Sequence, residues 1–86
     1  MELREAVDRA KEALRAMVDL EPARVTGVSV SEDGWRVVIE MVERKAIPDT
    51  QDILGAYEVR LDNSGHVTGY ERKRVRRRMD LEEVVE

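Results

Sequence analysis

Turn-forming residues divide most of this chain into short segments of alternating apolar residues, and this pattern constrains the fold more than any other feature. Gly34 closes a Glu-Asp-Gly turn, and Gly65 closes an Asp-Asn-Ser-Gly turn. The flanking segments predict strands at about 25–31, 35–44, 53–61 and 66–76. Because parallel strands need long crossover connections, strands joined this closely form an antiparallel sheet. We expect a meander, the simplest strand order.

The residues before the first strand have the spacing of an amphipathic helix over 2–20. The apolar residues of its stripe are Leu3, Val7, Ala10, Leu14, Met17 and Val18. Pro22 cannot continue the helix. One helix covers one face of a sheet, so we expect an α+β fold with an N-terminal amphipathic helix packed on one face of a four-stranded antiparallel sheet. The other face carries Val38 and Val42 among ionic side chains and is either solvated or an interface.

Length and composition limit the classes of protein to which the chain can belong. Its 86 residues are enough for one domain, which we place at 1–78, followed by an acidic C-terminal tail at 79–86. The absence of cysteine excludes disulfides and thiolate metal sites and fits a cytoplasmic protein. No apolar run approaches the ~20 residues of a membrane span. We therefore expect a cytoplasmic domain without a membrane span.

The sequence contains no residue combination that predicts catalysis. His66 is the single histidine, so a zinc site would lack ligands. There is no nucleophile elbow and no glycine-rich phosphate loop. Acids gather around one hairpin, but their spacing matches no calcium loop, and we expect them to form cross-strand ion pairs and loop caps. These acids are Glu40, Glu43, Asp49, Asp52 and Glu58. We expect no enzymatic activity, no catalytic or metal-binding residue and no cofactor.

The strongest electrostatic feature is a run of six positive charges in the seven residues 72–78. It could bind nucleic-acid phosphates, or an acidic protein surface, or the acids of the tail. It could also remain solvated on an edge strand, where charge prevents aggregation between sheets. The net charge of −4 and the scarcity of aromatic residues disfavour nucleic acid. Tyr70 becomes a contact candidate beside Arg72 if it faces solvent, and Gly69 leaves its direction open.

A set of motifs between Gly34 and Arg78, about half of the chain, follows the order of a known family. The motifs are Gly34-Trp35, Val38 to Glu43, Ile47-Pro48-Asp49-Thr50, Asp52, Leu54-Gly55, Tyr57-Glu58-Val59, Leu61-Asp62, Gly65, and Gly69-Tyr70 with Arg72. Together they resemble the gas vesicle protein O family, GvpO, whose members help to make gas vesicles. The chain departs from the family where Val75 or Arg76 replaces an expected aromatic residue near the arginines. The family's usual acidic, low-complexity leader is also missing or short.

The resemblance implies an accessory protein of gas vesicle formation and not the shell subunit. The sequence agrees, because a protein lining a gas space should be far more apolar than one in which 40% of residues are charged. Our hypothesis is a non-enzymatic adaptor, cytoplasmic and associated with gas vesicles, that binds other gas vesicle assembly or shell proteins. The candidate contact residues are Ile47, Pro48, Asp49, Tyr70, Arg72, Arg74 and Arg76.

Two alternatives remain open. One is a small nucleic-acid-binding regulator that uses the basic strand 72–78, for which affinity would fall steeply with salt. The other, compatible with the adaptor role, is a homodimer in which Val38 and Val42 meet across a two-fold axis.

Overall fold

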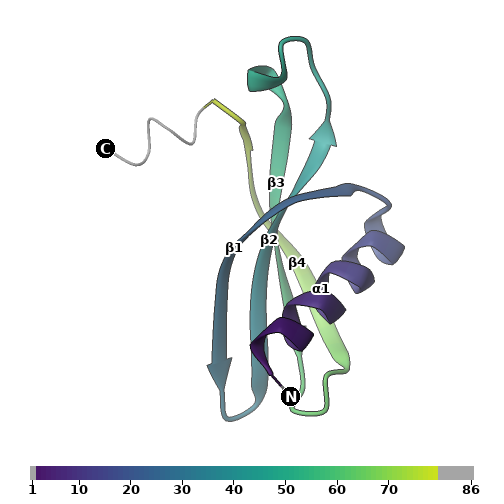
Figure 1. Cartoon of the computed structure of the whole chain (residues 1–86), viewed down its shortest axis with the longest axis vertical. Coiled ribbons are helices and arrows are strands. Elements are labelled where there is room, and N and C mark those ends of the chain that lie inside the picture. The colour runs from purple at the N-terminus through teal and green to yellow at the C-terminus, as the bar shows by residue number, and fades with distance from the viewer. Residues whose placement is uncertain (1, 80–86) are drawn as a thin grey trace.

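The computed structural model describes residues 2–79, which form one helix lying against one four-stranded sheet (Figure 1). The elements are α1 (Leu3–Val18), β1 (Glu21–Ser31), β2 (Gly34–Arg44), the 3-10 helix η1 (Asp49–Gln51), β3 (Ile53–Leu61) and β4 (Val67–Arg77). The strand order is β1-β2-β3-β4 and all three neighbouring pairs are antiparallel. The predicted α+β fold and meander are therefore confirmed. Apart from Met79, the predicted acidic tail lies outside the described residues.

Both tight turns form where the sequence predicts them. In the first, Ser31 pairs with Gly34, whose φ is 143°. A Cβ at this position would lie 1.9 Å from the carbonyl oxygen of Leu61, so only glycine fits. An Asp-Gly turn of the type I′ class would place positive φ angles on both residues, but here the positive φ falls on Gly34 and not on Asp33. In the second turn, the Asp62 carboxylate accepts hydrogen bonds from following backbone amides, including that of Ser64 at 2.9 Å.

The helix is shorter than predicted and the first strand is longer. Helix α1 ends at Val18, because Asp19 adopts the left-handed conformation with φ 54° and ψ 44°. Strand β1 then begins at Glu21, four residues before the predicted start of the strand, and includes Pro22. Proline is tolerated there because β1 is an edge strand.

An irregularity at Gly27 shapes the first strand. The β1–β2 register shifts between Val25, which pairs with Ile39, and Gly27. The extra residue allows Val25 and Val28, three positions apart, to pack against the same core.

The core lies between α1 and the face of the sheet toward it, and its residues match the predicted alternation. The buried residues are Ala10, Leu14, Val37, Ile39, Met41, Tyr57, Val59 and Leu61. Two residues of the predicted helical stripe lie outside it, since Leu3 is 56% exposed and Met17 is 44% exposed. Ala6, which the predicted stripe omits, is fully buried instead. Figure 1 shows α1 near the end of the sheet that holds the tight turns, while the β2–β3 loop projects from the opposite end.

Leu14→Ala should therefore lower the free energy of unfolding by about 2–5 kcal/mol, because it leaves a cavity among fully buried side chains. Urea unfolding followed by circular dichroism would measure the change. Leu3→Ala in the same helix is the matched control and should change stability by less than about 1 kcal/mol, since Leu3 is mostly exposed. Equal losses in the two variants would contradict this placement of the core.

Candidate partner-binding surface

Two arginines of β4 reach across β3 to carboxylates of β2. Arg76 binds Glu40, and Arg72 binds Glu43. The strand between them carries two small residues, Gly55 and Ala56, on opposite faces of the sheet. A Cβ at Gly55 would lie 2.0 Å from Glu43 Oε2, so the absent side chain is what lets this carboxylate lie over β3. Each pair thus connects three strands, one pair on each face.

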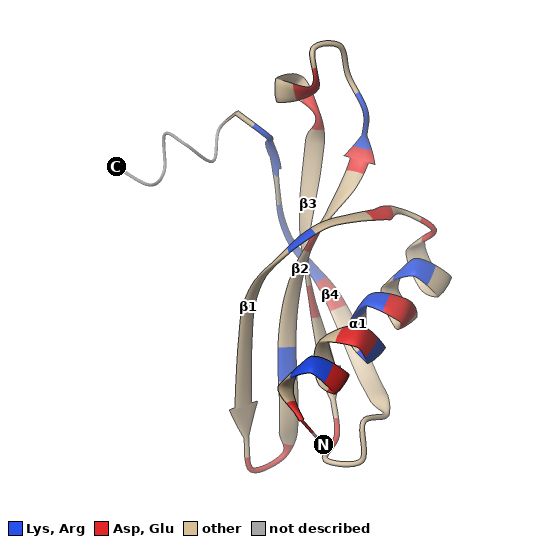
Figure 2. Ribbon diagram, viewed as in Figure 1, with Lys and Arg blue, Asp and Glu red and all other residues tan. Residues whose placement is uncertain are grey.

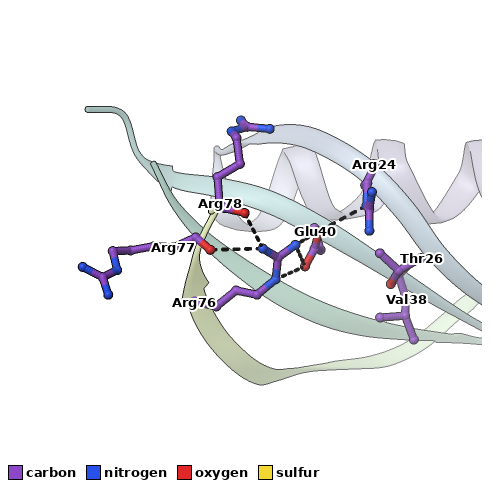
Figure 3. A network of polar contacts seen from close by, with 7 residues as sticks. All are labelled: Arg24, Thr26, Val38, Glu40, Arg76, Arg77 and Arg78. Atoms are coloured by element: carbon purple, nitrogen blue, oxygen red, sulfur yellow. Dashed lines mark hydrogen bonds and ion pairs between the residues drawn. The ribbon is translucent and has the colours of Figure 1, made fainter. Parts of the chain in front are cut away.

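The pair on the face away from α1 is the more buried (Figure 3). Arg76 Nε donates to Glu40 Oε2 at 2.9 Å and Nη2 donates to Oε1 at 2.6 Å, a bidentate arrangement. The Glu40 side chain is 7% exposed and that of Arg76 is 15% exposed. Arg76 Nη1 also donates to the backbone carbonyls of Arg77 and Arg78, and Arg24 of β1 lies 3.4 Å from Glu40. This guanidinium is therefore engaged within the fold.

The same arginine helps to shield the sheet face that α1 does not cover. Arg76 is the register partner of Leu54, which is 2% exposed, and Glu40 is the partner of the buried Ala56. An arginine stem can cover apolar surface while its guanidinium is hydrogen-bonded. This part of the second face is therefore closed, whereas Val38 and Val42 on the same face are half-buried.

The second pair lies on the face toward α1 and includes a tyrosine. The Tyr57 hydroxyl donates to Glu43 Oε2 at 2.8 Å, and Arg72 Nε donates to the same oxygen at 3.0 Å. Burial raises the pKa of Tyr57 above its usual value, and the adjacent Glu43 carboxylate raises it further. Tyr57 therefore stays protonated and serves as a donor.

A bulge in β4 sends its arginines to different faces. Arg72 pairs in register with Tyr57 and Arg74 pairs with Ala56, so Lys73 is the extra residue between them. Arg72 consequently lies on the face toward α1, whereas Arg74 and Arg76 lie on the other face. Tyr70 is the register partner of Val59, so it shares the face of Arg72, and it is 41% exposed.

Much of the basic run is neutralised inside the fold. Figure 2 shows its cations along the C-terminal half of β4, next to acidic residues of neighbouring strands. Besides the two bridging pairs, Arg78 lies 3.1 Å from Asp52 and Lys73 lies 3.5 Å from Glu71. The predicted cross-strand pairs of Glu40 and Glu43 are confirmed. Arg74 is exposed, and no ion pair joins it to another residue within 2–79.

The β2–β3 loop presents an exposed tip on a hydrogen-bonded base. Ile47, which precedes Pro48 through a cis peptide bond, is 100% exposed, and Asp49 is also exposed. At the base, Asp52 Oδ1 accepts a hydrogen bond from the Ala46 amide at 2.8 Å, which confirms the predicted loop cap. This hydrogen bond, with a further contribution from Arg78, holds the pKa of Asp52 below its ordinary value.

The end of β4 is attached to this loop. The Arg78 amide donates to the Asp52 carbonyl at 2.8 Å, and the Met79 amide donates to the Thr50 carbonyl at 3.0 Å. The base of the loop and the C-terminal end of the basic strand are thus brought together at one end of the molecule, whereas Tyr70 and Arg72 lie farther along β4, on the face toward α1. We use the name loop–β4 surface for the loop tip and the exposed predicted residues of β4 taken together: Ile47, Pro48, Asp49, Tyr70, Arg72 and Arg74. Their role in binding stays a prediction.

The sequence pattern did not predict the partners that organise this surface. The contacts of Arg76 with Glu40 and of Arg72 with Glu43 were not predicted, and neither were Arg24 and Arg78 as further partners of the acids. The available signal was the Gly55-Ala56 dipeptide, because small residues in a strand interior often mark a close approach.

Within residues 2–79, no group of three or more histidine, cysteine or acidic side chains is placed to hold a metal ion. Helix α1 is not long and apolar enough to cross a membrane.

The comparisons with known proteins relate this chain to one family. The family described as "Gas vesicle synthesis protein GvpO" matches residues 1–82. The chain is 46% identical to gas vesicle protein O of Haloferax mediterranei over 82 residues, which are 94% of this chain and 59% of that protein. It is 44% identical to gas vesicle protein O1 of Halobacterium salinarum over 81 residues, 94% of this chain and 68% of that protein. No solved structure matches the chain.

Arg76→Ala should destabilise the fold by roughly 3 kcal/mol, because it leaves the buried Glu40 carboxylate without its bidentate partner while Arg24 keeps one contact. Arg74→Ala removes an exposed arginine two positions away and should cost at most about 0.5 kcal/mol. Chemical denaturation of both variants would measure the difference. Similar stability in the two would show that the Glu40 pair does not hold the sheet together.

The stabilising effect of Asp52 should disappear in acid. Because the folded-state pKa of Asp52 is lowered, its contribution is complete above the unfolded-state pKa of about 3.9 and is lost as pH falls through the folded-state value. The melting temperature of Asp52→Asn should therefore lie below that of the wild type at neutral pH and approach it below about pH 4. Asp8→Asn on the exposed face of α1 is the control for a lost charge. A difference between wild type and Asp52→Asn that is independent of pH would contradict this assignment.

Proposed function

Because the chain belongs to the gas vesicle synthesis protein GvpO family, we propose that it acts in gas vesicle formation as a non-enzymatic adaptor. It binds other gas vesicle assembly or shell proteins through the loop–β4 surface, in the cytoplasm and in association with gas vesicles. One observation carries the proposal: the base of the loop that bears the exposed apolar tip is hydrogen-bonded to the C-terminal end of the basic strand.

The loop tip supplies an apolar contact at a low entropic cost. Ile47 is fully exposed, although an isolated large aliphatic side chain gains nothing from contact with water. The hydrogen bond between Asp52 and Ala46 and those from the β4 end to the loop restrain its base before any partner arrives. Prior order of this kind favours binding, because less conformational freedom is lost. Pro48 and Asp49 follow Ile47 and complete the tip.

The arginines of the basic strand contribute to partner binding to different degrees. Arg74 is the exposed cation available to an acidic partner, and electrostatic attraction of this kind mainly raises the association rate. Arg72 and Arg76 fix the position of β4 through Glu43 and Glu40, so their contribution to binding is indirect. Tyr70, partly exposed next to Arg72 on the face toward α1, adds an aromatic contact at the rim.

The test compares Ile47→Asp and Arg74→Glu with the wild type in cells that express the native gene cluster. Each variant should remain folded, since both residues are exposed, and each should reduce the number of gas vesicles counted by electron microscopy. Arg4→Glu, a charge reversal on exposed α1, is the matched control and should leave vesicles normal. Normal vesicles from a variant that carries both Ile47→Asp and Arg74→Glu would overturn the proposal.

A nuclease-treated pull-down of tagged protein, read by mass spectrometry, tests the partner directly. Gas vesicle proteins should be recovered with the wild type and reduced at least about tenfold with Ile47→Asp, a loss of about 1.4 kcal/mol in binding. Recovery of no gas vesicle protein, together with nucleic acid that is retained when the nuclease is omitted and whose binding weakens steeply with salt, would replace the adaptor by a nucleic-acid-binding regulator.

A further inference from the structure

The two open edges of the sheet differ in charge. Strand order places β1 and β4 at the edges, where unpaired backbone groups can template another strand. Edge β4 carries five cations in residues 72–77 and two register shifts, and both features discourage pairing. Residues 25–31 of β1 contain no charged residue, in a chain that is 40% charged. The C-terminal end of the β1 edge therefore lacks the usual protection, unlike its start, which contains Glu21, Pro22 and Arg24.

The end of this edge is regular and accessible. Both register shifts of β1 lie before Gly27, and from Gly27 to Ser31 every residue pairs in sequence with β2. Three residues are exposed: Ser29, Val30 and Ser31. Val30 is 64% exposed, although it lies on the same face of the sheet as the core-facing Val28. In Figure 1, β1 forms the rim of the sheet, with no part of the described chain beyond its C-terminal half.

We propose that the segment 27–31 of β1 pairs antiparallel with the same segment of a second copy, which joins the two sheets across a two-fold axis. With Ser29 on the axis, Ser29 faces its own copy, and Val28 of one chain lies opposite Val30 of the other. Residues directly opposite share a face of the sheet, so the two valine pairs meet on the side of α1. The exposed Val30 thereby gains an apolar neighbour.

The distribution of charge favours strand pairing with a second copy at β1 and disfavours it at β4. Within 27–31 the two-fold operation brings only glycine, serine and valine opposite one another. The same operation on residues 72–77 of β4 would bring Lys and Arg of one copy against Lys and Arg of the other, and like charges opposite each other destabilise strand pairing. A self-complementary, uncharged strand is suited to an isologous contact.

This inference goes beyond the proposed function and does not depend on it. Because β1 and β4 lie at opposite edges, a dimer through β1 leaves the loop–β4 surface of each copy accessible. Two such surfaces in one assembly would allow simultaneous contact with two sites on a growing structure, which raises apparent affinity without any new contact. The dimer through β1 also differs from a dimer through Val38 and Val42, which would use the face of the sheet and not its edge.

The test is sedimentation velocity of the purified full chain over a range of concentrations. The wild type should sediment as a dimer at high concentration. Ser29→Lys places two cations opposite each other on the axis and should raise the dimer dissociation constant at least about tenfold. Ser29→Glu should behave likewise, and an equimolar mixture of the two variants should recover the dimer. Ser64→Lys, in the exposed β3–β4 turn, is the matched control and should dimerise as the wild type.

The outcomes are distinct. A wild type that remains monomeric up to millimolar concentration would overturn the inference. So would a dimer that survives Ser29→Lys but is lost in Val38→Lys, since the interface would then be the sheet face. Ile47→Asp should retain the dimer while it loses partner capture, so a failure of the proposed adaptor role is distinguishable from a failure of the dimer. Circular dichroism would verify that each variant keeps its sheet.

Discussion

The contact between Arg76 and Glu40 is the interaction on which the rest of the structure depends. A carboxylate in the middle of β2 is tolerated in a buried position only because a guanidinium binds both of its oxygens. That contact ties the edge strand β4 to the central strand β2 across the small residue Ala56. Two residues after Arg76, Arg78 binds the Asp52 carboxylate and anchors the base of the projecting loop.

The pair also explains how one short helix is enough for a four-stranded sheet. Helix α1 covers the core on one face, and the opposite face has no second layer within residues 2–79. The aliphatic stem of Arg76 lies beside Leu54 there, while its charged end is neutralised by Glu40. The high charge content of the chain is thus partly structural, because its charges close a face that apolar residues do not cover.

This arrangement separates two surfaces that can serve different purposes. Internal pairing leaves the β4 edge with a limited exposed charge that includes Arg74, and the residues that follow β4 are hydrogen-bonded to the base of the loop. The uncharged end of β1 lies at the opposite edge. The proposed adaptor role needs partners held in a defined geometry, and a sheet whose central strands are fixed by ion pairs gives these edges a constant separation. The Glu43 pair on the face toward α1 adds to this rigidity through Tyr57.

The sequence by itself determined the antiparallel meander, the helix and the core faces of β2 and β3, because alternation and turn chemistry are local and Gly34 and Gly65 leave few other conformations. It also determined the family, through motifs that recur in order along the chain. Only the tertiary structure decided which carboxylate each arginine binds, because Arg72 and Glu43 are 29 positions apart and Arg76 and Glu40 are 36 apart. It likewise decided which face each arginine occupies, since one extra residue at Lys73 reverses the alternation and no local signal in the sequence marks that bulge.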